Sequence, residues 1–263
     1  MLTALRRCLM ALGFLLLCLP LLSRAENTAI GVVLMHGKGG SPTKHVAELA
    51  TALEARGYRV ANLEMPWSGR RDYDVDVATA EREVEAALDS LRQKGAVKLF
   101  VAGHSQGGMF ALYFGSRHVV DGIIAIAPGG DPSTPRFREA LGPSMELAKK
   151  LVGEGKGFDK ARFSDFEGSR GLFPVLTTPA IYLSWFAPEG EMNGMKAVRG
   201  MRPGVPVLYI APTNDYPGLR KDKQQMFDGL PANPRSKLYE PSASHLGAPS
   251  ASLGEIVEWT SAL

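Results

Sequence analysis

The chain has 263 residues, of which 45% are hydrophobic and 22% charged, and its formal net charge is +3. This length is sufficient for one domain with a large buried core. Such a balanced composition gives no indication of a disordered, collagen-like or nucleic-acid-binding protein.

Residues 1–25 have the layout of a secretory signal peptide. Two arginines are followed by an apolar run from Cys8 to Leu22, and small residues, Ser23 and Ala25, stand three and one positions before the end of the segment. We expect cleavage after residue 25 and export to the periplasm or the medium. Because the run is short for a transmembrane helix, an uncleaved anchor is the second interpretation.

Removal of this segment changes the expected chemistry of the chain. Both cysteines would be lost, so the mature protein would depend on its core without disulfides. Three arginines and no acidic residue would also be lost, leaving 27 basic against 27 acidic residues. We therefore expect a single domain over residues 26–263 with no nucleic-acid partner and no stable membrane span after processing, while the oligomeric state stays open.

The first part of the expected domain is a βαβ unit. An apolar strand over residues 29–35 ends in the glycine loop His36–Gly40, and a helix is expected from Pro42 to about Arg56. A second strand follows over residues 58–65. This order predicts a parallel sheet.

Acidic residues precede the next expected helix, residues 77–93. Asp72, Asp74, Asp76 and Glu83 have the spacing of four calcium-loop ligands, but a valine stands where that loop needs glycine. An acidic helix N-terminus explains them more simply, so we expect no metal site.

The stretch from Val97 to Ser116 contains the candidate nucleophile. An apolar strand ends at Gly103, and helical spacing of apolar residues begins at Gln106. Ser105 therefore lies at the apex of a G-x-S-x-G turn between strand and helix, which exposes the serine hydroxyl beside the first amides of the helix.

A long insertion follows the next strand, residues 121–128, because another clear strand appears only at residues 205–211. We expect a cap over residues 131–202, with helical segments over 138–152 and 161–166. Most of its large apolar side chains should pack the cap onto the body, and a few should line a substrate pocket. The candidates for substrate binding are Trp185, Phe186, Met192 and Met195.

Two further polar residues follow strands near the end of the chain. Asp215 lies in a turn after the strand that follows the cap, and His245 lies in a loop of small residues after a last expected strand, residues 236–240. Helices are expected over residues 219–227 and 250–262.

Four segments, HGKGG, GHSQGG, PTND and SHLG, occur in this order and together resemble the α/β-hydrolase family. The resemblance covers Ala29 to Ala262. It implies an α/β fold with a reduced, mostly parallel sheet of about six strands, flanked by helices, and with a cap inserted after the fourth strand.

The residues have distinct expected roles. Ser105 is the candidate nucleophile, His245 the general base and then acid, and Asp215 the carboxylate that orients the imidazole. The backbone amide of Gln106 would bind the oxyanion and, as the resemblance implies, so would that of Lys38. We expect the Lys38 side chain to be solvated.

Other residues compete for two of these roles. Asp131 and Glu240 are alternative carboxylates, although the turn directly after its strand favours Asp215. His36 and His104 are expected to stabilise the loop and the turn rather than to act as bases.

These features predict an exported serine hydrolase that cleaves a small or medium ester or thioester through an acyl-enzyme and needs no cofactor. One alternative is an acyltransferase or perhydrolase that uses the same triad. Another is a hydrolase-fold binding protein without catalysis. Such a protein would usually have lost one member of the triad, whereas all three candidates are present here.

Overall fold

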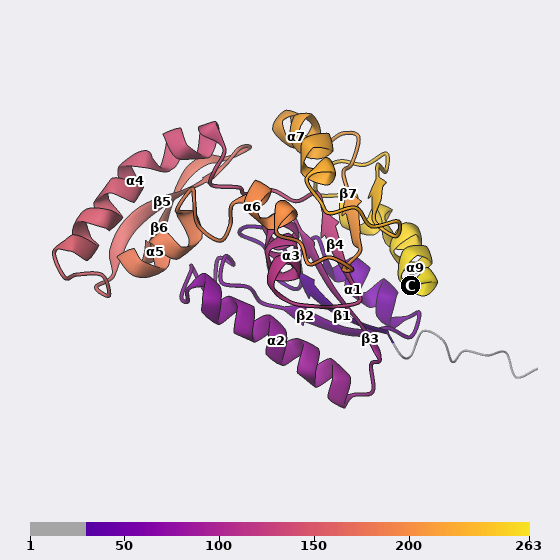
Figure 1. Cartoon of the computed structure of the whole chain (residues 1–263). Helices are drawn as coiled ribbons and strands as arrows, with labels where there is room; N and C mark the ends of the chain where they lie inside the picture. Colours follow the sequence, from indigo (N-terminus) through magenta and orange to yellow (C-terminus); the bar gives the residue numbers. More distant parts are fainter. Residues whose placement is uncertain (1–29) are drawn as a thin grey trace, which may run out of the picture.

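The structure is a computed structural model that describes residues 30–263 of the chain (Figure 1). The expected signal peptide, residues 1–25, lies outside the described residues.

Six strands form one sheet in which every neighbouring pair is parallel, in the order β2-β1-β3-β4-β7-β8. The strands are β1 (Ile30–Met35), β2 (Arg59–Leu63), β3 (Lys98–His104), β4 (Gly122–Ile126), β7 (Val207–Ile210) and β8 (Lys237–Tyr239). All six residues of β1 are buried, as expected for a strand covered by helices on both faces. The predicted parallel sheet of about six strands is therefore confirmed.

Helices cover both faces of this sheet, and alternate side chains of each strand point to opposite faces. Val33 and Val101 pack on one side with α2 and α3, whereas Val32 and Phe100 pack on the other side with α1 and α9. The helices of the body are α1 (Ala47–Glu54), α2 (Val77–Gln93), α3 (Gln106–Arg117), α7 (Pro217–Asp228), α8 (Ala248–Ala251) and α9 (Leu253–Ala262). Within residues 30–263, none of the helices has the length and apolarity needed to cross a membrane.

The first helix begins later than its sequence predicts. It was expected from Pro42, but α1 starts at Ala47. His45 has a φ of 56°, which is left-handed backbone and cannot continue a right-handed helix. The turns of residues 41–46 therefore precede α1 instead of belonging to it.

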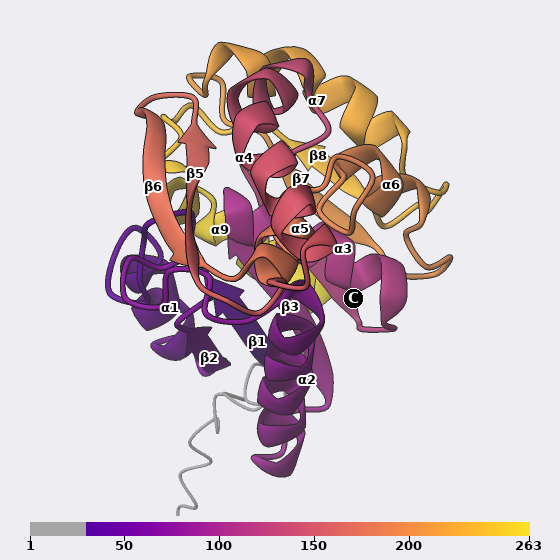
Figure 2. The same cartoon turned by 90° about the vertical axis from the view of Figure 1, so that its left-hand side faces the viewer.

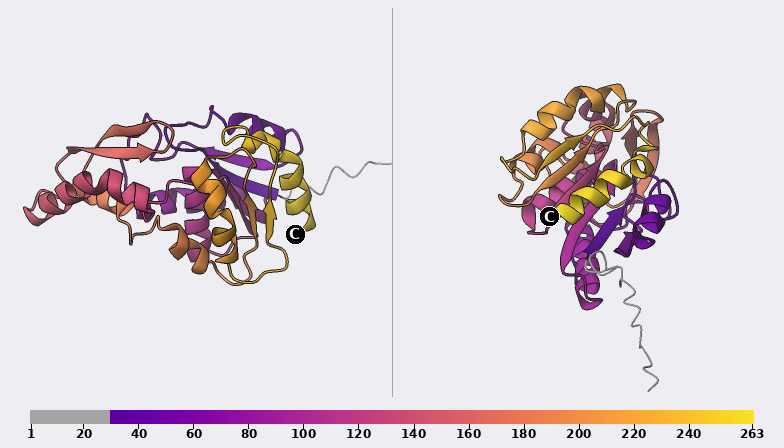
Figure 3. Two further views of the ribbon diagram at one scale, coloured as in Figure 1. Left: turned by 90° about the horizontal axis from the view of Figure 1, so that it is seen from above. Right: turned by 90° about the vertical axis from the view of Figure 1, so that its right-hand side faces the viewer.

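The insertion between β4 and β7 forms a lobe at one end of the molecule, opposite the C-terminal helix α9 (Figure 3). It contains α4 (Pro135–Gly153), β5 (Ala161–Glu167), β6 (Gly171–Thr177), α5 (Pro179–Phe186) and α6 (Gly194–Arg199). The strands β5 and β6 form an antiparallel hairpin beside α4 and α5 (Figures 1 and 2). The predicted insertion after the fourth strand is therefore present, and we call the segment from α4 to α6 the cap.

One predicted element of the cap is wrong. Residues 161–166 were expected to be helical, but they belong to β5. Phe163 and Asp165 are buried while Arg162 is exposed, an alternation typical of a strand with one covered face. The hairpin partner β6 supplies backbone hydrogen bonds that a short segment alone could not form.

The turn between β3 and α3 leaves no space for a side chain at Gly103. A Cβ atom there would overlap the Gly107 carbonyl and would lie 2.8 Å from the Gly108 nitrogen. Because these are backbone atoms, they cannot move away without disturbing the first turn of α3.

We expect Gly103→Ala to destabilise the protein by about 3 kcal/mol, since the overlap must be relieved by a backbone shift. Gly254→Ala is the matched control: this exposed glycine lies in α9 with nothing within 4 Å of the new methyl group, and alanine should stabilise the helix there by about 0.5 kcal/mol. Urea unfolding of both variants measures the difference. A Gly103→Ala midpoint equal to that of the wild type would contradict the close approach.

Candidate active site

Ser105 lies at the turn between β3 and α3 in a strained backbone conformation, with φ 54° and ψ −115°. The neighbouring backbone holds it there: the Ser105 amide donates to Ile126 O at 2.9 Å, and the Gly129 amide donates to Ser105 O at 3.1 Å. A strained residue of this kind persists only where its surroundings fix it, and such residues are concentrated at functional sites. The geometry agrees with the nucleophile turn that the sequence predicts.

Asp215 and His245 form a buried pair. The two loops that carry them run side by side, with a parallel bridge between Asn214 and Ser244. His245 Nδ1 donates to Asp215 Oδ1 at 2.7 Å, and the Tyr216 amide donates to the same oxygen at 2.6 Å. This arrangement places the ring proton on Nδ1 and leaves Nε2 with its lone pair, as a general base requires.

His104 supports His245 from the residue next to Ser105. Its Nε2 donates to His245 O at 2.9 Å, and the two ring centroids are 4.8 Å apart. Burial, reinforced by the charge of a protonated His245, lowers the pKa of His104 to about 3. His104 is therefore a neutral donor at physiological pH and is suited to hold the backbone of His245 rather than to act as the base.

His104 lies between the two candidates: it directly precedes Ser105 in the chain, and its ring contacts His245. Among the hydrogen bonds of the described residues there is none between Ser105 Oγ and His245. Bonds between a nucleophile and its base are commonly long in the absence of substrate and become shorter in the complex.

Two free backbone amides lie beside the nucleophile. A Cβ atom at Gly37 would lie 3.1 Å from Ser105 Cβ, so the loop after β1 touches the serine and Lys38 is the next residue. The amides of Gly39 and Gly40 donate to Trp67 O and Gly37 O. Within residues 30–263, the amides of Lys38 and Gln106 have no backbone acceptor, which leaves both available to bind an oxyanion.

The Lys38 side chain is not solvated, contrary to its expected position. Its Nζ lies 2.6 Å from Asp165 Oδ1 and 3.1 Å from Phe166 O, both on the cap strand β5. The Lys38 side chain is 7% exposed and that of Asp165 is 0% exposed. The sequence gives no local signal for this contact, because Lys38 and Asp165 are 127 positions apart.

His36 stabilises the start of the glycine loop after β1. Its Nδ1 donates to Gly37 O at 2.7 Å, and its Nε2 accepts from the Met65 amide at 3.0 Å. Burial lowers the pKa of His36, which favours the neutral ring that these two bonds require. His36 thereby joins the loop after β1 to the end of β2.

The alternative carboxylates have other partners. Asp131 accepts from the amides of Ser133 at 2.8 Å and Gly194 at 3.0 Å, and burial raises its pKa. Glu240 pairs with Lys223. Since Asp215 is the carboxylate that contacts His245, the geometry favours it over both alternatives.

The acidic residues before α2 and in its first half are engaged within the protein. Arg71 pairs with Asp74 and Glu83, and Asp76 caps α2 by accepting from the Thr79 amide at 2.8 Å. These contacts account for the acidic spacing through an ion pair and a helix cap.

Three of the four candidate substrate residues, Trp185, Phe186 and Met192, are buried in the core between cap and body. Trp185 Nε1 donates to Val75 O at 2.7 Å, and the Phe186 ring centroid lies 5.1 Å from that of Tyr73. These contacts pack the cap onto the body, and contact of the three residues with substrate stays a prediction.

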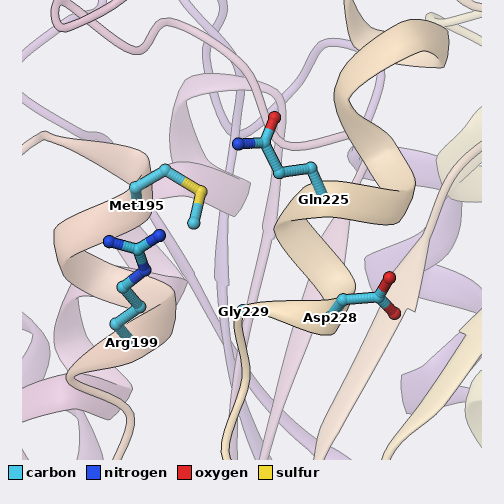
Figure 4. Close-up of a pocket in the computed structure, with 5 residues that line it drawn as sticks. All are labelled: Met195, Arg199, Gln225, Asp228 and Gly229. Carbon is cyan, nitrogen blue, oxygen red and sulfur yellow. The ribbon is translucent and has the colours of Figure 1, made fainter.

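Met195 lies apart from these residues, in an open groove of about 550 Å³ between α6 and α7 (Figure 4). The groove does not include Ser105 among its lining residues, which are Met195, Arg199, Gln225, Asp228 and Gly229.

Comparison with known proteins places the chain in a family. The sequence model of the alpha/beta hydrolase family matches residues 32–258. The chain therefore belongs to this family.

Two curated relatives are similar in sequence. The thermostable monoacylglycerol lipase of Bacillus sp. (strain H-257) is 31% identical over 137 residues, which are 46% of this chain and 54% of the lipase. Esterase EstD of Thermotoga maritima is 26% identical over 207 residues, which are 73% of this chain and 48% of the esterase. The chain thus matches about half the length of these relatives.

A solved structure of similar fold is the monoacylglycerol lipase of Paleococcus ferrophilus. The TM-score is 0.61 at 21% identity, over 88% of this chain and 94% of the lipase. At this identity the likeness confirms the fold alone.

The neutral state of His104 should make stability depend on pH. Its pKa is lowered from 6.5 to about 3 on folding, so the unfolded chain takes up the proton first as the pH falls. The resulting contribution of His104 to the free energy of unfolding is complete above pH 6.5 and is lost between pH 6.5 and about 3. Over this range the free energy of unfolding falls with a slope that approaches about 1.4 kcal/mol per pH unit.

We expect His104→Gln, which keeps a side-chain donor but cannot be protonated, to reduce this slope in urea unfolding between pH 4 and 8. The exposed His45 provides a control, His45→Asn, since asparagine tolerates its left-handed backbone. His45→Asn should retain the wild-type slope. Equal slopes for wild type and His104→Gln would show that His104 is not the buried group responsible.

Proposed function

We propose that this alpha/beta hydrolase is a serine hydrolase that cleaves a small or medium carboxylic ester through an acyl-enzyme on Ser105. The observation that carries the proposal is the strained Ser105 turn together with the buried hydrogen bond from His245 to Asp215. Both relatives matched in sequence are described as ester-cleaving enzymes, a monoacylglycerol lipase and an esterase.

The proposed reaction begins with proton transfer from Ser105 Oγ to His245 Nε2 as the oxygen attacks the ester carbonyl. Asp215 stabilises the resulting imidazolium and holds the ring in position. The amides of Lys38 and Gln106 donate to the oxyanion of the tetrahedral intermediate. Collapse of the intermediate releases the alcohol, which takes the proton from His245, and water then cleaves the acyl-enzyme by the same steps.

The surroundings of Ser105 support an ester with an apolar part. A Cβ atom at Gly129 would lie 3.8 Å from Ser105 Oγ and 3.3 Å from Leu219 Cδ1, so an apolar side chain of α7 lies near the nucleophile. An acyl or alkyl group next to the reacting carbon would meet this leucine rather than a charge. The same residues could process a thioester, and a non-water acceptor would make the protein an acyltransferase or perhydrolase.

We expect a p-nitrophenyl phosphonate to label Ser105 covalently, because it mimics the tetrahedral intermediate. Ser105→Ala should abolish labelling and hydrolysis of p-nitrophenyl butyrate. Asp215→Asn should lower kcat by about 10⁴-fold, since it permits the wrong imidazole tautomer. Mass spectrometry of the labelled protein and initial rates measure these effects.

The matched control for the carboxylate is Glu240→Gln, which removes the competing acid on the surface and should retain wild-type kcat. Loss of activity in Glu240→Gln, but not in Asp215→Asn, would move the acid to residue 240. A folded wild-type chain that neither reacts with the phosphonate nor hydrolyses any ester or thioester of a broad panel would instead indicate a binding protein.

We also propose export, which rests on the sequence of residues 1–25 alone. The expected mature protein begins at Glu26, so intact-mass measurement of protein recovered from the periplasm or medium should give the mass of residues 26–263. Replacing Ala25 with a bulky residue, Ala25→Leu, should block cleavage at this position. Recovered protein that still carries Met1 would indicate a retained anchor.

A further inference from the structure

A buried ion pair connects the cap to the loop beside the nucleophile. Lys38, which follows Gly37 in the loop that contacts Ser105, extends its side chain to Asp165 on β5, with 2.6 Å between Nζ and Oδ1. A second hydrogen bond joins Lys38 Nζ to Phe166 O at 3.1 Å. The loop after β1 and the cap strand are thus joined by two bonds to one ammonium group.

Asp165 is itself held from two further directions. Tyr73, in the segment after β2, donates its hydroxyl to Asp165 Oδ2 at 2.8 Å, and the Phe166 amide donates to Oδ1 at 2.6 Å. Both carboxylate oxygens therefore have partners, as a buried carboxylate requires. Burial raises the pKa of Tyr73 well above its ordinary value, so its hydroxyl remains a donor.

Aromatic rings of the cap enclose the Lys38 ammonium group. The ring centroids of Phe137 on α4 and Phe186 on α5 lie 5.3 and 5.6 Å from Nζ. These rings exclude water and leave Asp165 as the counter-charge. The ammonium group therefore has a defined position only while the cap is docked on the body.

The position of the Lys38 side chain affects the orientation of the Lys38 backbone amide. Gly37 and the Ser105 turn are in close contact on one side of Lys38, and the Gly39 amide donates to Trp67 O on the other side. The Lys38 amide itself has no backbone acceptor within the described residues, so its direction is set by its neighbours and its side chain. An oxyanion donor contributes fully only when it points at the developing charge before the reaction begins.

We infer that Asp165 is a positioning residue of the active site: through the Lys38 side chain, the cap fixes the backbone amide of Lys38 in the direction needed to bind the oxyanion. The inference rests on the proposed hydrolase function. Asp165 touches neither substrate nor Ser105 in this role, and it acts through Lys38 alone.

The test is the kinetics of Asp165→Asn and Lys38→Met on p-nitrophenyl butyrate, with rates divided by the fraction of enzyme labelled by the phosphonate. Each variant should lower kcat by about 10-fold to 100-fold and change KM by less than about threefold, because the lost interaction is made in the transition state. Lys38→Met retains the backbone amide and removes the ammonium group, with its bonds to Asp165 and to Phe166 O.

A double variant, Lys38→Met/Asp165→Asn, separates catalysis from folding. It leaves no unpaired buried charge, and the asparagine oxygen can still accept a hydrogen bond from the Tyr73 hydroxyl. Its thermal midpoint should be near that of the wild type, while its kcat should fall no further than in the single variants, since both disrupt one interaction. Wild-type kcat in this folded double variant would overturn the inference, even if the single variants fail to fold.

Ser184→Ala is the matched control for cap docking. The Val77 amide at the start of α2 donates to Ser184 Oγ on α5 at 3.3 Å, so this change weakens a cap-to-body contact that does not involve Lys38, Asp165 or Tyr73. Its kcat should be near the wild-type value. A loss as large as that of Asp165→Asn would mean that general loosening of the cap, not the position of Lys38, lowers the rate.

Hydrogen exchange provides a readout independent of turnover. The peptide covering residues 36–44 should exchange faster in Asp165→Asn than in the wild type or Ser184→Ala, because the loop loses its attachment to β5. A different result would contradict the proposed hydrolase function itself. In that case the wild-type protein would neither be labelled by the phosphonate nor show activity that depends on Ser105. Activity that depends on Ser105, with wild-type kcat and exchange in Asp165→Asn, would overturn this inference alone.

Discussion

The close contact between β3 and α3 is the constraint on which the candidate site depends. With no side chain at Gly103, the first turn of α3 lies directly against the end of the strand, and the chain between them must turn at Ser105. The strained conformation of Ser105 is maintained because the end of β4 and the segment after it bind both its amide and its carbonyl. The parallel sheet thus fixes the position of the serine through hydrogen bonds to its backbone.

Apolar packing and a buried ion pair both join the cap to the body, and they have different effects. Trp185, Phe186 and Met192 bury apolar surface, which stabilises the docked cap but specifies no direction for any single group. The pair of Lys38 and Asp165 is directional, because each bond requires a particular position of donor and acceptor. The apolar contacts keep the cap in place, and the ion pair couples it to one backbone segment.

The parts of the molecule that depend on local sequence could be predicted. The strands of the parallel sheet, the helix over residues 77–93 and the turn at Ser105 follow from hydrophobic periodicity and glycine spacing. The contact between Asp215 and His245 agrees with the order of the two residues after neighbouring strands. The turn directly after its strand favoured Asp215 over Asp131 in the sequence, and the structure adds a reason, because Asp131 is engaged by the amides of Ser133 and Gly194.

The features that could not be predicted arise from partners distant in the chain. β5 is a strand because β6 pairs with it, although its isolated sequence resembled a helix. Lys38 and Asp165 are separated by 127 positions, and the ammonium group is buried only because α4 and α5 place aromatic rings over it. Since an unpaired charge at that depth would be strongly destabilising, docking of the cap and ordering of the loop beside Ser105 must occur together. The cap therefore contacts the loop beside Ser105 through a directional polar bond as well as through apolar packing.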